Sequence, residues 1–210
     1  MSGATRPYVV QQGDYLAKLA ERFRFDADAV WALGANAALR AKRKPDQLCA
    51  GDVLHIPEKP APAIALECGV TNSYTAAVPR APVNLVFEVD GKPIANEPCV
   101  VEGLGAPLET QTDGSGALSL SVPVIVREVT VRLVKRNVVH AIRIGDMDPI
   151  EEDSGVAQRL VHLCLLVDRR KDESEAVADA IRRFQQREAL RITGEANDET
   201  RAALVRIHGS

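Results

Sequence analysis

Three hydrophobic periods follow one another along the chain. Apolar residues recur at helical spacing near the N-terminus, alternate with polar residues in the middle, and return to helical spacing after about residue 151. A helix places positions i, i+3, i+4 and i+7 on one face, whereas a strand sends successive side chains to opposite faces. The pattern predicts a multidomain α+β protein: a β-α-α-β module at 1–58, a small antiparallel β-sandwich at 82–150 and three helices at 151–210.

The N-terminal module is predicted from its strand and cap signals. A strand at 8–10 precedes Asp14, which we expect to cap a helix, and Asp26 or Asp28 is expected to cap a second helix. A closing strand follows at 53–57. The apolar face of the first helix is expected to consist of Leu16, Leu19, Ala20 and Phe23, and that of the second of Val30, Trp31 and Leu33.

The middle region begins after a segment, 59–81, that is rich in proline and alanine near its start and is predicted to be a linker with an entry strand. The inward residues of three expected strands are Leu85, Phe87 and Val89; Leu118, Leu120 and Val122; and Val129, Val131 and Leu133. Turn formers separate these runs at 90–91 and 113–116. The second turn lacks the alternating acidic ligands of a calcium loop, so a hairpin turn is the favoured interpretation.

The last region carries three helical stripes. They consist of Val156, Leu160 and Leu163; Val177, Ile181 and Phe184; and Leu204 and Ile207. Asp172 with Glu175 resembles a capping box before the middle helix. An extended link at 190–192 precedes Asn197 or Asp198, either of which is predicted to cap the final helix.

Two of these regions resemble known families. Tyr8, Val10, Gly13-Asp14, Leu16, Leu19-Ala20, Phe23, Asn36, Gly51-Asp52, Leu54 and Ile56-Pro57 follow the order and spacing of a LysM domain. Such a domain implies a groove for N-acetylated glycan such as peptidoglycan. The resulting glycan-binding candidates are Gly13, Asp14, Tyr15, Leu16, Asn36, Leu39 and Arg40. The chain departs from the family at Tyr15, where Thr or Ser is usual, and in a longer, more basic segment between Asn36 and Gly51. Tyr15 is the preferred sugar contact, whereas Trp31 is assigned to the core.

The C-terminal region is similar to the peptidoglycan-binding family 1 domain. The similarity rests on Val156, Gln158, Leu160, Leu163, Ala180-Ile181, Phe184-Gln185, Leu190, Thr193-Gly194, Asn197, Thr200 and Ala203-Leu204. It adds Phe184 and Gln185 to the binding candidates. The chain departs from the family at Cys164, where glycine is usual, and in the charged loop at 168–172. The turns of the middle region resemble those of transthyretin-like or carboxypeptidase-regulatory-like sandwiches.

Composition and charge restrict the ligands, the location and the cysteine state that we expect for this chain. The chain has 210 residues, a net charge of −3 and only short basic runs at 42–44 and 169–171, so nucleic-acid binding is not expected. No apolar stretch is long enough to span a bilayer, and no signal-like segment opens the chain, so synthesis in the bacterial cytoplasm is expected. Cys49, Cys68, Cys99 and Cys164 are expected to be reduced, with a Cys68–Cys99 disulfide as the alternative.

No catalytic or cofactor site is predicted. The four histidines are scattered, so no metal or other cofactor is expected; the Cys49–His55 proximity is assigned to structure, and His140 to partial burial. Two functions stay open for a protein without enzymatic activity. One is a wall-binding or scaffolding protein associated with a type VI secretion or phage-tail-like contractile injection apparatus, which would carry it to the periplasm or outside. The other is an adaptor for spike, baseplate or effector proteins that binds no glycan. An accessory module of a cell-wall hydrolase is a further alternative.

Overall fold

The computed structural model describes residues 4–58, 68–72, 78–89 and 91–209. These residues form two compact units, 1–146 and 147–210, and the first holds both the predicted N-terminal module and the predicted sandwich. The predicted linker at 59–81 falls largely outside the described residues, although β3 begins within it at Arg80. The boundary between the units lies at 146–147, four residues before the predicted start of the helical domain.

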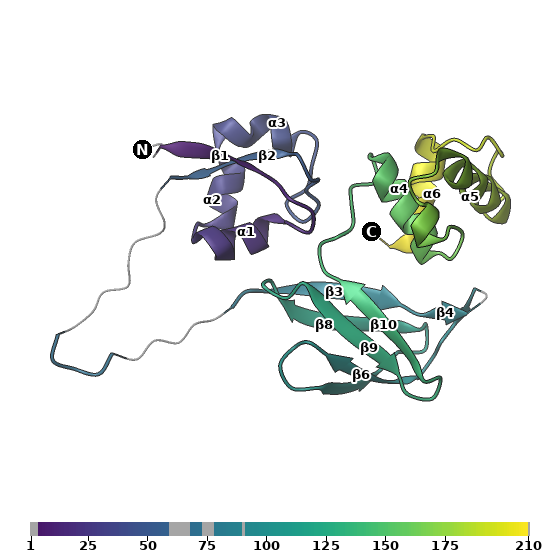
Figure 1. The fold of residues 1–210 in the computed structure, drawn as a ribbon, viewed down its shortest axis with the longest axis horizontal. Helices are drawn as coiled ribbons and strands as arrows, with labels where there is room; N and C mark the ends of the chain where they lie inside the picture. Colours follow the sequence, from purple (N-terminus) through teal and green to yellow (C-terminus); the bar gives the residue numbers. More distant parts are fainter. Residues whose placement is uncertain (1–3, 59–67, 73–77, 90, 210) are drawn as a thin grey trace. The chain divides into compact units, whose positions relative to one another are not determined.

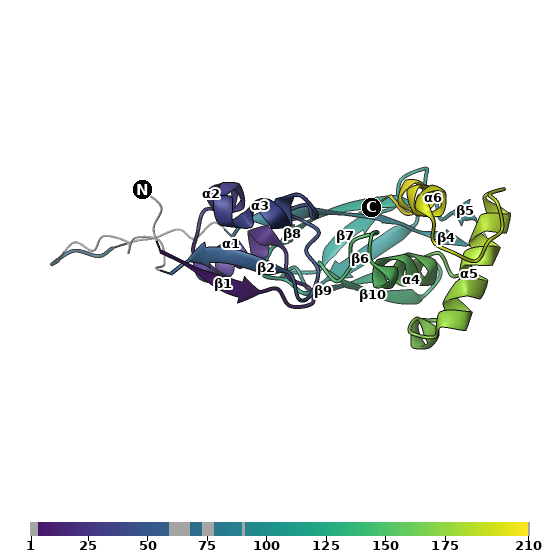
Figure 2. The ribbon, with the colours of Figure 1, turned by 90° about the horizontal axis from the view of Figure 1, so that it is seen from above.

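The N-terminal lobe consists of two antiparallel strands and a group of short helices (Figure 1). Its elements are β1 (Thr5–Val9), α1 (Leu16–Phe23), α2 (Ala27–Ala32), the 3₁₀ turn η1 (Gly34–Asn36), α3 (Ala37–Arg40) and β2 (Val53–Pro57). The predicted strand–helix–helix–strand order is confirmed, and η1 and α3 are additions to it. Strand β1 pairs with β2 from Thr5 opposite Pro57 to Val9 opposite Val53, and the two strands run side by side in Figure 2.

The helix caps of this lobe differ from one another. Asp26 caps α2 as predicted, since its carboxylate accepts a hydrogen bond from the Ala29 N–H at 2.7 Å. Asp14 does not cap α1, because Tyr15 holds the N-cap position. The Asp14 carboxylate instead accepts hydrogen bonds from the Tyr8 hydroxyl at 2.7 Å and the Gln11 N–H at 3.1 Å, which closes the turn before the helix.

The second lobe of this unit is built from antiparallel sheets, as predicted. Its strands are β3 (Arg80–Val86), β4 (Glu88–Val89), β5 (Lys92–Pro93), β6 (Pro98–Glu102), β7 (Leu108–Gln111), β8 (Ala117–Pro123), β9 (Glu128–Leu133) and β10 (Val138–Arg143). The described strands form a four-stranded sheet in the order β10-β9-β6-β7, a β3-β8 pair and a β4-β5 pair. Both β8 and β9 bury their predicted inward residues in one common core.

Two expectations for this lobe are wrong. The alternation predicted to continue to Val89 ends after Phe87, because β3 stops at Val86 and Val89 is exposed in the short β4-β5 pair. The turn at 113–116 is not a hairpin, since β7 and β8 belong to different sheets and the turn carries the chain between them. The Asp113 carboxylate holds this turn by accepting hydrogen bonds from the Ser115 hydroxyl and from the N–H groups of Ala117 and Ser115. These hydrogen bonds lower the pKa of Asp113.

The C-terminal unit contains the three predicted helices. They are α4 (Asp153–His162), α5 (Ser174–Arg187) and α6 (Asp198–His208), with a 3₁₀ turn η2 (Asp168–Arg170) in the charged loop. Asn197 caps α6 by accepting from the Thr200 N–H at 2.9 Å. The predicted capping box before α5 is wrong, because Glu173 holds the N-cap position and makes no side-chain cap bond.

The core of this unit lies among the three helices. Its largest fully buried apolar side chains are Leu160, Phe184 and Leu204, one from each helix. Gly155 lets α4 approach the preceding chain closely, since a Cβ there would lie 2.0 Å from the Pro149 carbonyl oxygen. Arg159 is buried beside this contact and donates to the carbonyls of Asp148 and Gly155, and burial lowers its pKa.

Candidate functional site

A groove in the C-terminal unit is the candidate functional site. It has a volume of about 650 Å³ and is bordered by the first turns of α4 and α5, the end of the charged loop and the segment 194–197. Its lining residues are Asp153, Ser154, Val156, Lys171, Asp172, Ser174, Val177, Ala178, Ile181, Gly194, Glu195, Ala196, Asn197 and Arg201. The volume is in the range of sites for small molecules and short polymers.

The groove combines an apolar floor with a charged rim. Val156 and Ile181 are almost fully buried, so they belong to both the core and the floor, and Val177 and Ala178 extend the apolar surface along α5. The rim carries Lys171 and Arg201 together with the acidic residues of the lining. Apolar walls with a few polar groups suit a ligand that has both aliphatic and charged parts.

The wall formed by 194–197 is held in place by Gln185. Its side chain is fully buried. The amide oxygen accepts from the N–H groups of Thr193 at 2.8 Å and Gly194 at 3.0 Å, and the amide nitrogen donates to the Thr200 hydroxyl at 2.9 Å and the Glu195 carbonyl at 3.0 Å. One side chain therefore fixes the turn, the link and the start of α6.

Arg201 links the 194–197 wall of the groove to the residues around the start of α4. Its guanidinium donates to the carbonyls of Ala196 and Ile150 and pairs with Asp153 at 2.9 Å. These contacts join the start of α6 to the segment before α4. The backbone on both sides of the groove is thus anchored by side chains whose donors and acceptors are already used within the unit.

The two binding candidates predicted in this unit lie behind the groove. Phe184 and Gln185 both have no exposed surface, and neither lines the groove. Phe184 packs in the core, and Gln185 supports the wall from inside. Residues that do line the groove, such as Ser174 and Ala178, were not singled out from the sequence, because small residues on a helix carry no chemical signature.

The candidates of the N-terminal lobe fall into two groups. Gly13 and Arg40 are partly exposed, and the Arg40 guanidinium donates to the carbonyls of Trp31 and Leu33. Asp14, Leu16, Leu39 and Asn36 are buried. Asn36 donates to the carbonyls of Val30 and His55 and accepts from the His55 N–H at 2.7 Å, so its amide ties the helices to β2 and is already satisfied.

Tyr15 does not present its ring to solvent as expected for a sugar contact. Only 6% of the residue is exposed, and the ring belongs to the core of the second lobe. Its hydroxyl donates to the Val124 carbonyl at 3.3 Å, and burial raises its pKa. The ring contacts the Gly145 segment so closely that a Cβ at Gly145 would lie 2.8 Å from Tyr15 Cδ1.

The remaining chemistry of the described residues is limited. Within that part of the chain, no group of three or more His, Cys, Asp or Glu side chains could hold a metal ion, and no helix is long and apolar enough to cross a membrane. All four cysteines are described, and none of them forms a disulfide. His140 packs against Phe87 with ring centroids 5.3 Å apart, consistent with a structural role.

The C-terminal unit is a small three-helix domain with a groove on its surface. Residues 165–204 match the family described as a putative peptidoglycan binding domain. The match spans α5 and most of α6 and includes much of the groove lining, whereas α4 precedes it. No curated protein and no solved structure matches the chain significantly.

Proposed function

We propose that this protein is a non-catalytic peptidoglycan-binding protein whose C-terminal groove takes a segment of the wall polymer. The observation that carries the proposal is the coincidence of the groove with the family match at 165–204. Peptidoglycan combines sugar rings, aliphatic peptide side chains and ionised groups. The apolar floor and the charged rim are complementary to those parts.

Sedimentation with purified sacculi tests this proposal. Ala178→Gln places a longer neutral side chain in the groove without changing the charge, and Ala202→Gln makes the same change at an exposed position of α6 outside the lining. Alanine and glutamine have similar helix propensities, so both variants are expected to fold. We expect Ala178→Gln alone to reduce the sedimented fraction. Equal sedimentation of the two variants, or none for the unaltered protein, would reject the groove as the site.

We further propose that the N-terminal lobe is a LysM module that binds the same polymer. Two modules on one chain gain avidity when both can engage, because the second binding event is intramolecular. Supporting this proposal are the LysM-like spacing of its residues and the strand–helix–strand order of the lobe. Sedimentation of the full chain should then exceed that of the Ala178→Gln variant, which should still bind weakly through the N-terminal lobe.

A second candidate function is an adaptor that contacts proteins of a secretion or contractile injection apparatus. It is favoured by exposed valines on the β9-β10 hairpin, namely Val134, Val138 and Val139. Strand β10 lies at the edge of the four-stranded sheet, where its free backbone groups can pair with another strand. Co-purification with a spike, baseplate or effector protein that is lost in Val139→Lys, without any sedimentation by sacculi, would favour this function.

A role without catalysis predicts that the protein leaves the wall polymer intact. Incubation with sacculi should release no soluble muropeptides or reducing ends above the level of a boiled control. Release of such fragments would overturn the non-catalytic assignment. If release occurs only when a partner hydrolase is added, the accessory-module alternative is supported.

A further inference from the structure

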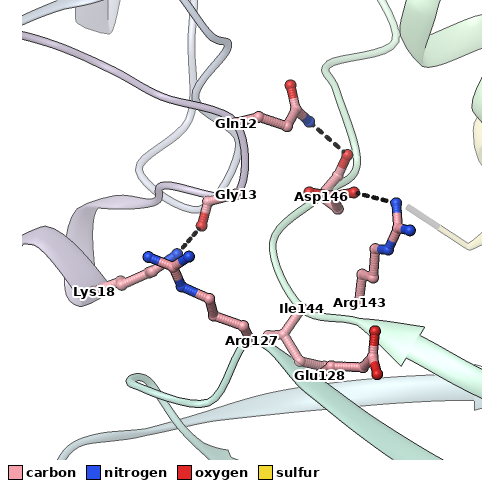
Figure 3. Close-up of a pocket in the computed structure, with 8 residues that line it drawn as sticks. All are labelled: Gln12, Gly13, Lys18, Arg127, Glu128, Arg143, Ile144 and Asp146. Carbon is pink, nitrogen blue, oxygen red and sulfur yellow. Dashed lines mark hydrogen bonds and ion pairs between the residues drawn. The ribbon is translucent and has the colours of Figure 1, made fainter.

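A second pocket lies within the 1–146 unit and has a different chemistry. Its volume is about 290 Å³, and it is lined by Gln12, Gly13, Lys18, Arg127, Glu128, Arg143, Ile144 and Asp146 (Figure 3). The lining comes from the turn before α1, from α1 itself, from the start of β9 with the residue before it, and from the end of β10 with the segment after it. In contrast to the C-terminal groove, most of these residues are charged or polar.

The backbone around this pocket is well anchored. The Ile144 N–H donates to the Arg127 carbonyl at 2.8 Å, which joins the segment after β10 to the segment before β9. The Gln12 amide donates to the Asp146 carbonyl at 2.8 Å and so joins the turn before α1 to the same segment (Figure 3). The backbone that carries the charged side chains is therefore held by contacts on both sides of the pocket.

Two cationic groups lie close together in the pocket lining, Lys18 and the solvent-exposed Arg127. The Lys18 side chain is only 11% exposed; its ammonium donates to the Gly13 carbonyl and lies 3.7 Å from the Asp14 carboxylate. Burial lowers the pKa of Lys18, and the nearby charge of Arg127 lowers it further, against the opposing effect of Asp14. The two like charges repel each other, so an anion bound close to both would be stabilised by both charges.

The Arg127 guanidinium is exposed, so its donors are accessible to a ligand. Among the described residues, its guanidinium forms no ion pair and no hydrogen bond, although Glu128 is its neighbour in the chain. Asp146 is paired with Arg143 at 3.5 Å (Figure 3). A guanidinium offers five donors in a planar fork that matches the two oxygens of a carboxylate or phosphate.

We propose that this pocket is a binding site for an oxyanion, held by Arg127 and Lys18. The inference deepens the proposed peptidoglycan binding, on which it rests for the origin of the anion: a carboxylate of the wall peptide, or a phosphate of a wall-linked polymer. Both anions carry the oxygen geometry that the guanidinium fork recognises. The pocket is large enough for the anionic group together with the atoms next to it.

Titration calorimetry with defined probes tests the site in the full chain. The probes are N-acetylmuramyl dipeptide with free carboxyl groups, the same compound with amidated carboxyl groups, and glycerol phosphate. Arg127→Gln removes the charge that has no protein partner. Arg132→Gln removes the same charge from an exposed position of β9 outside the pocket and serves as the matched control.

We expect Arg127→Gln to weaken binding of the recognised anion about tenfold and Arg132→Gln to leave it unchanged, since a charge-assisted hydrogen bond contributes roughly this factor. Binding of the free acid but not its amide assigns the anion to the wall peptide, and binding of glycerol phosphate assigns it to a phosphate polymer. Binding of none of the probes, or equal weakening by both variants, would overturn the proposal.

Two further measurements distinguish loss of the anion site from a loss of stability and from a loss of binding through the C-terminal groove. The melting temperature of Arg127→Gln should equal or exceed that of the unaltered protein, because the substitution relieves repulsion with Lys18 and removes no protein contact. A fall of several degrees would indicate a structural role for Arg127 and overturn the assignment. Ala178→Gln tests sacculus binding through the C-terminal groove, whereas Arg127→Gln tests the anion site. Failure of one proposal can therefore be distinguished from failure of the other.

Discussion

The imidazole rings of His162 and His208 stack on one another, with Nδ1 of the first 3.0 Å from Nε2 of the second. The pair joins the end of α4 to the end of α6. Burial, together with the charges of His162 and Arg159, lowers the pKa of His208 to about 4. Burial and Arg159 also lower the pKa of His162, against the opposing charge of Asp168.

This pair predicts a loss of stability in mild acid. An unfolded histidine has a pKa of about 6.5, so a group with a lower folded pKa contributes stability above pH 6.5 and loses it as the pH falls toward about 4. We expect the loss to reach roughly 1 to 2 kcal/mol over this range after allowance for solvent screening. Urea unfolding between pH 7 and pH 4 measures it. His208→Gln should make the dependence shallower, and an unchanged slope would contradict the role of the pair.

Gln185→Leu should strongly destabilise the C-terminal unit. The substitution retains the bulk of the side chain but leaves the N–H groups of Thr193 and Gly194 without their acceptor. Buried donors without partners cost about 1 to 3 kcal/mol each, so a loss of about 2 to 6 kcal/mol is expected for the two donors. Denaturant unfolding monitored by circular dichroism measures the change. Gln186→Leu at the exposed neighbouring position is the control, and similar losses in the two variants would exclude a specific role for the Gln185 amide.

Cys164→Gly should stabilise the same unit. Cys164 follows the end of α4 with a φ of 57°, a left-handed conformation that glycine adopts without strain and that is common just after a helix. Relief of about 1 kcal/mol is partly offset by the greater freedom of glycine in the unfolded chain, so a net gain of about 0.5 kcal/mol is expected. Thermal unfolding measures it. Cys164→Ala controls for loss of the thiol, and it should show no comparable gain.

Tyr15→Ala should destabilise the 1–146 unit, because it removes an aromatic ring from the core of the second lobe. Truncation of a buried aromatic side chain to alanine typically costs about 3 to 5 kcal/mol. Tyr15→Phe removes only the hydroxyl that donates to Val124 and should cost about 1 kcal/mol. Chemical denaturation distinguishes the two. A Tyr15→Ala protein with unaltered stability but weakened sacculus binding would instead restore Tyr15 as a sugar contact.

The sequence alone was sufficient for the type and order of most elements. Alternation at Leu118, Leu120 and Val122 predicted a strand with one buried face, and the structure confirms it. Asp26 and Asn197 were each predicted, with an alternative, to cap a helix, and both do so. These features are local, because periodicity and capping depend on residues only a few positions apart.

Only the tertiary structure decided which side chains line a site and which pack in the core or hold the backbone in place. Tyr15 meets Val124 across 109 positions of the chain, and this contact converts a predicted sugar-contact residue into a core residue. Gln185 was also predicted as a ligand contact, but its amide makes hydrogen bonds to the backbone that it anchors. The groove includes small residues that have no sequence signature. The pattern of apolar residues therefore determined the secondary structure. Burial and hydrogen bonding of individual polar residues depended on long-range packing, which a local pattern does not encode.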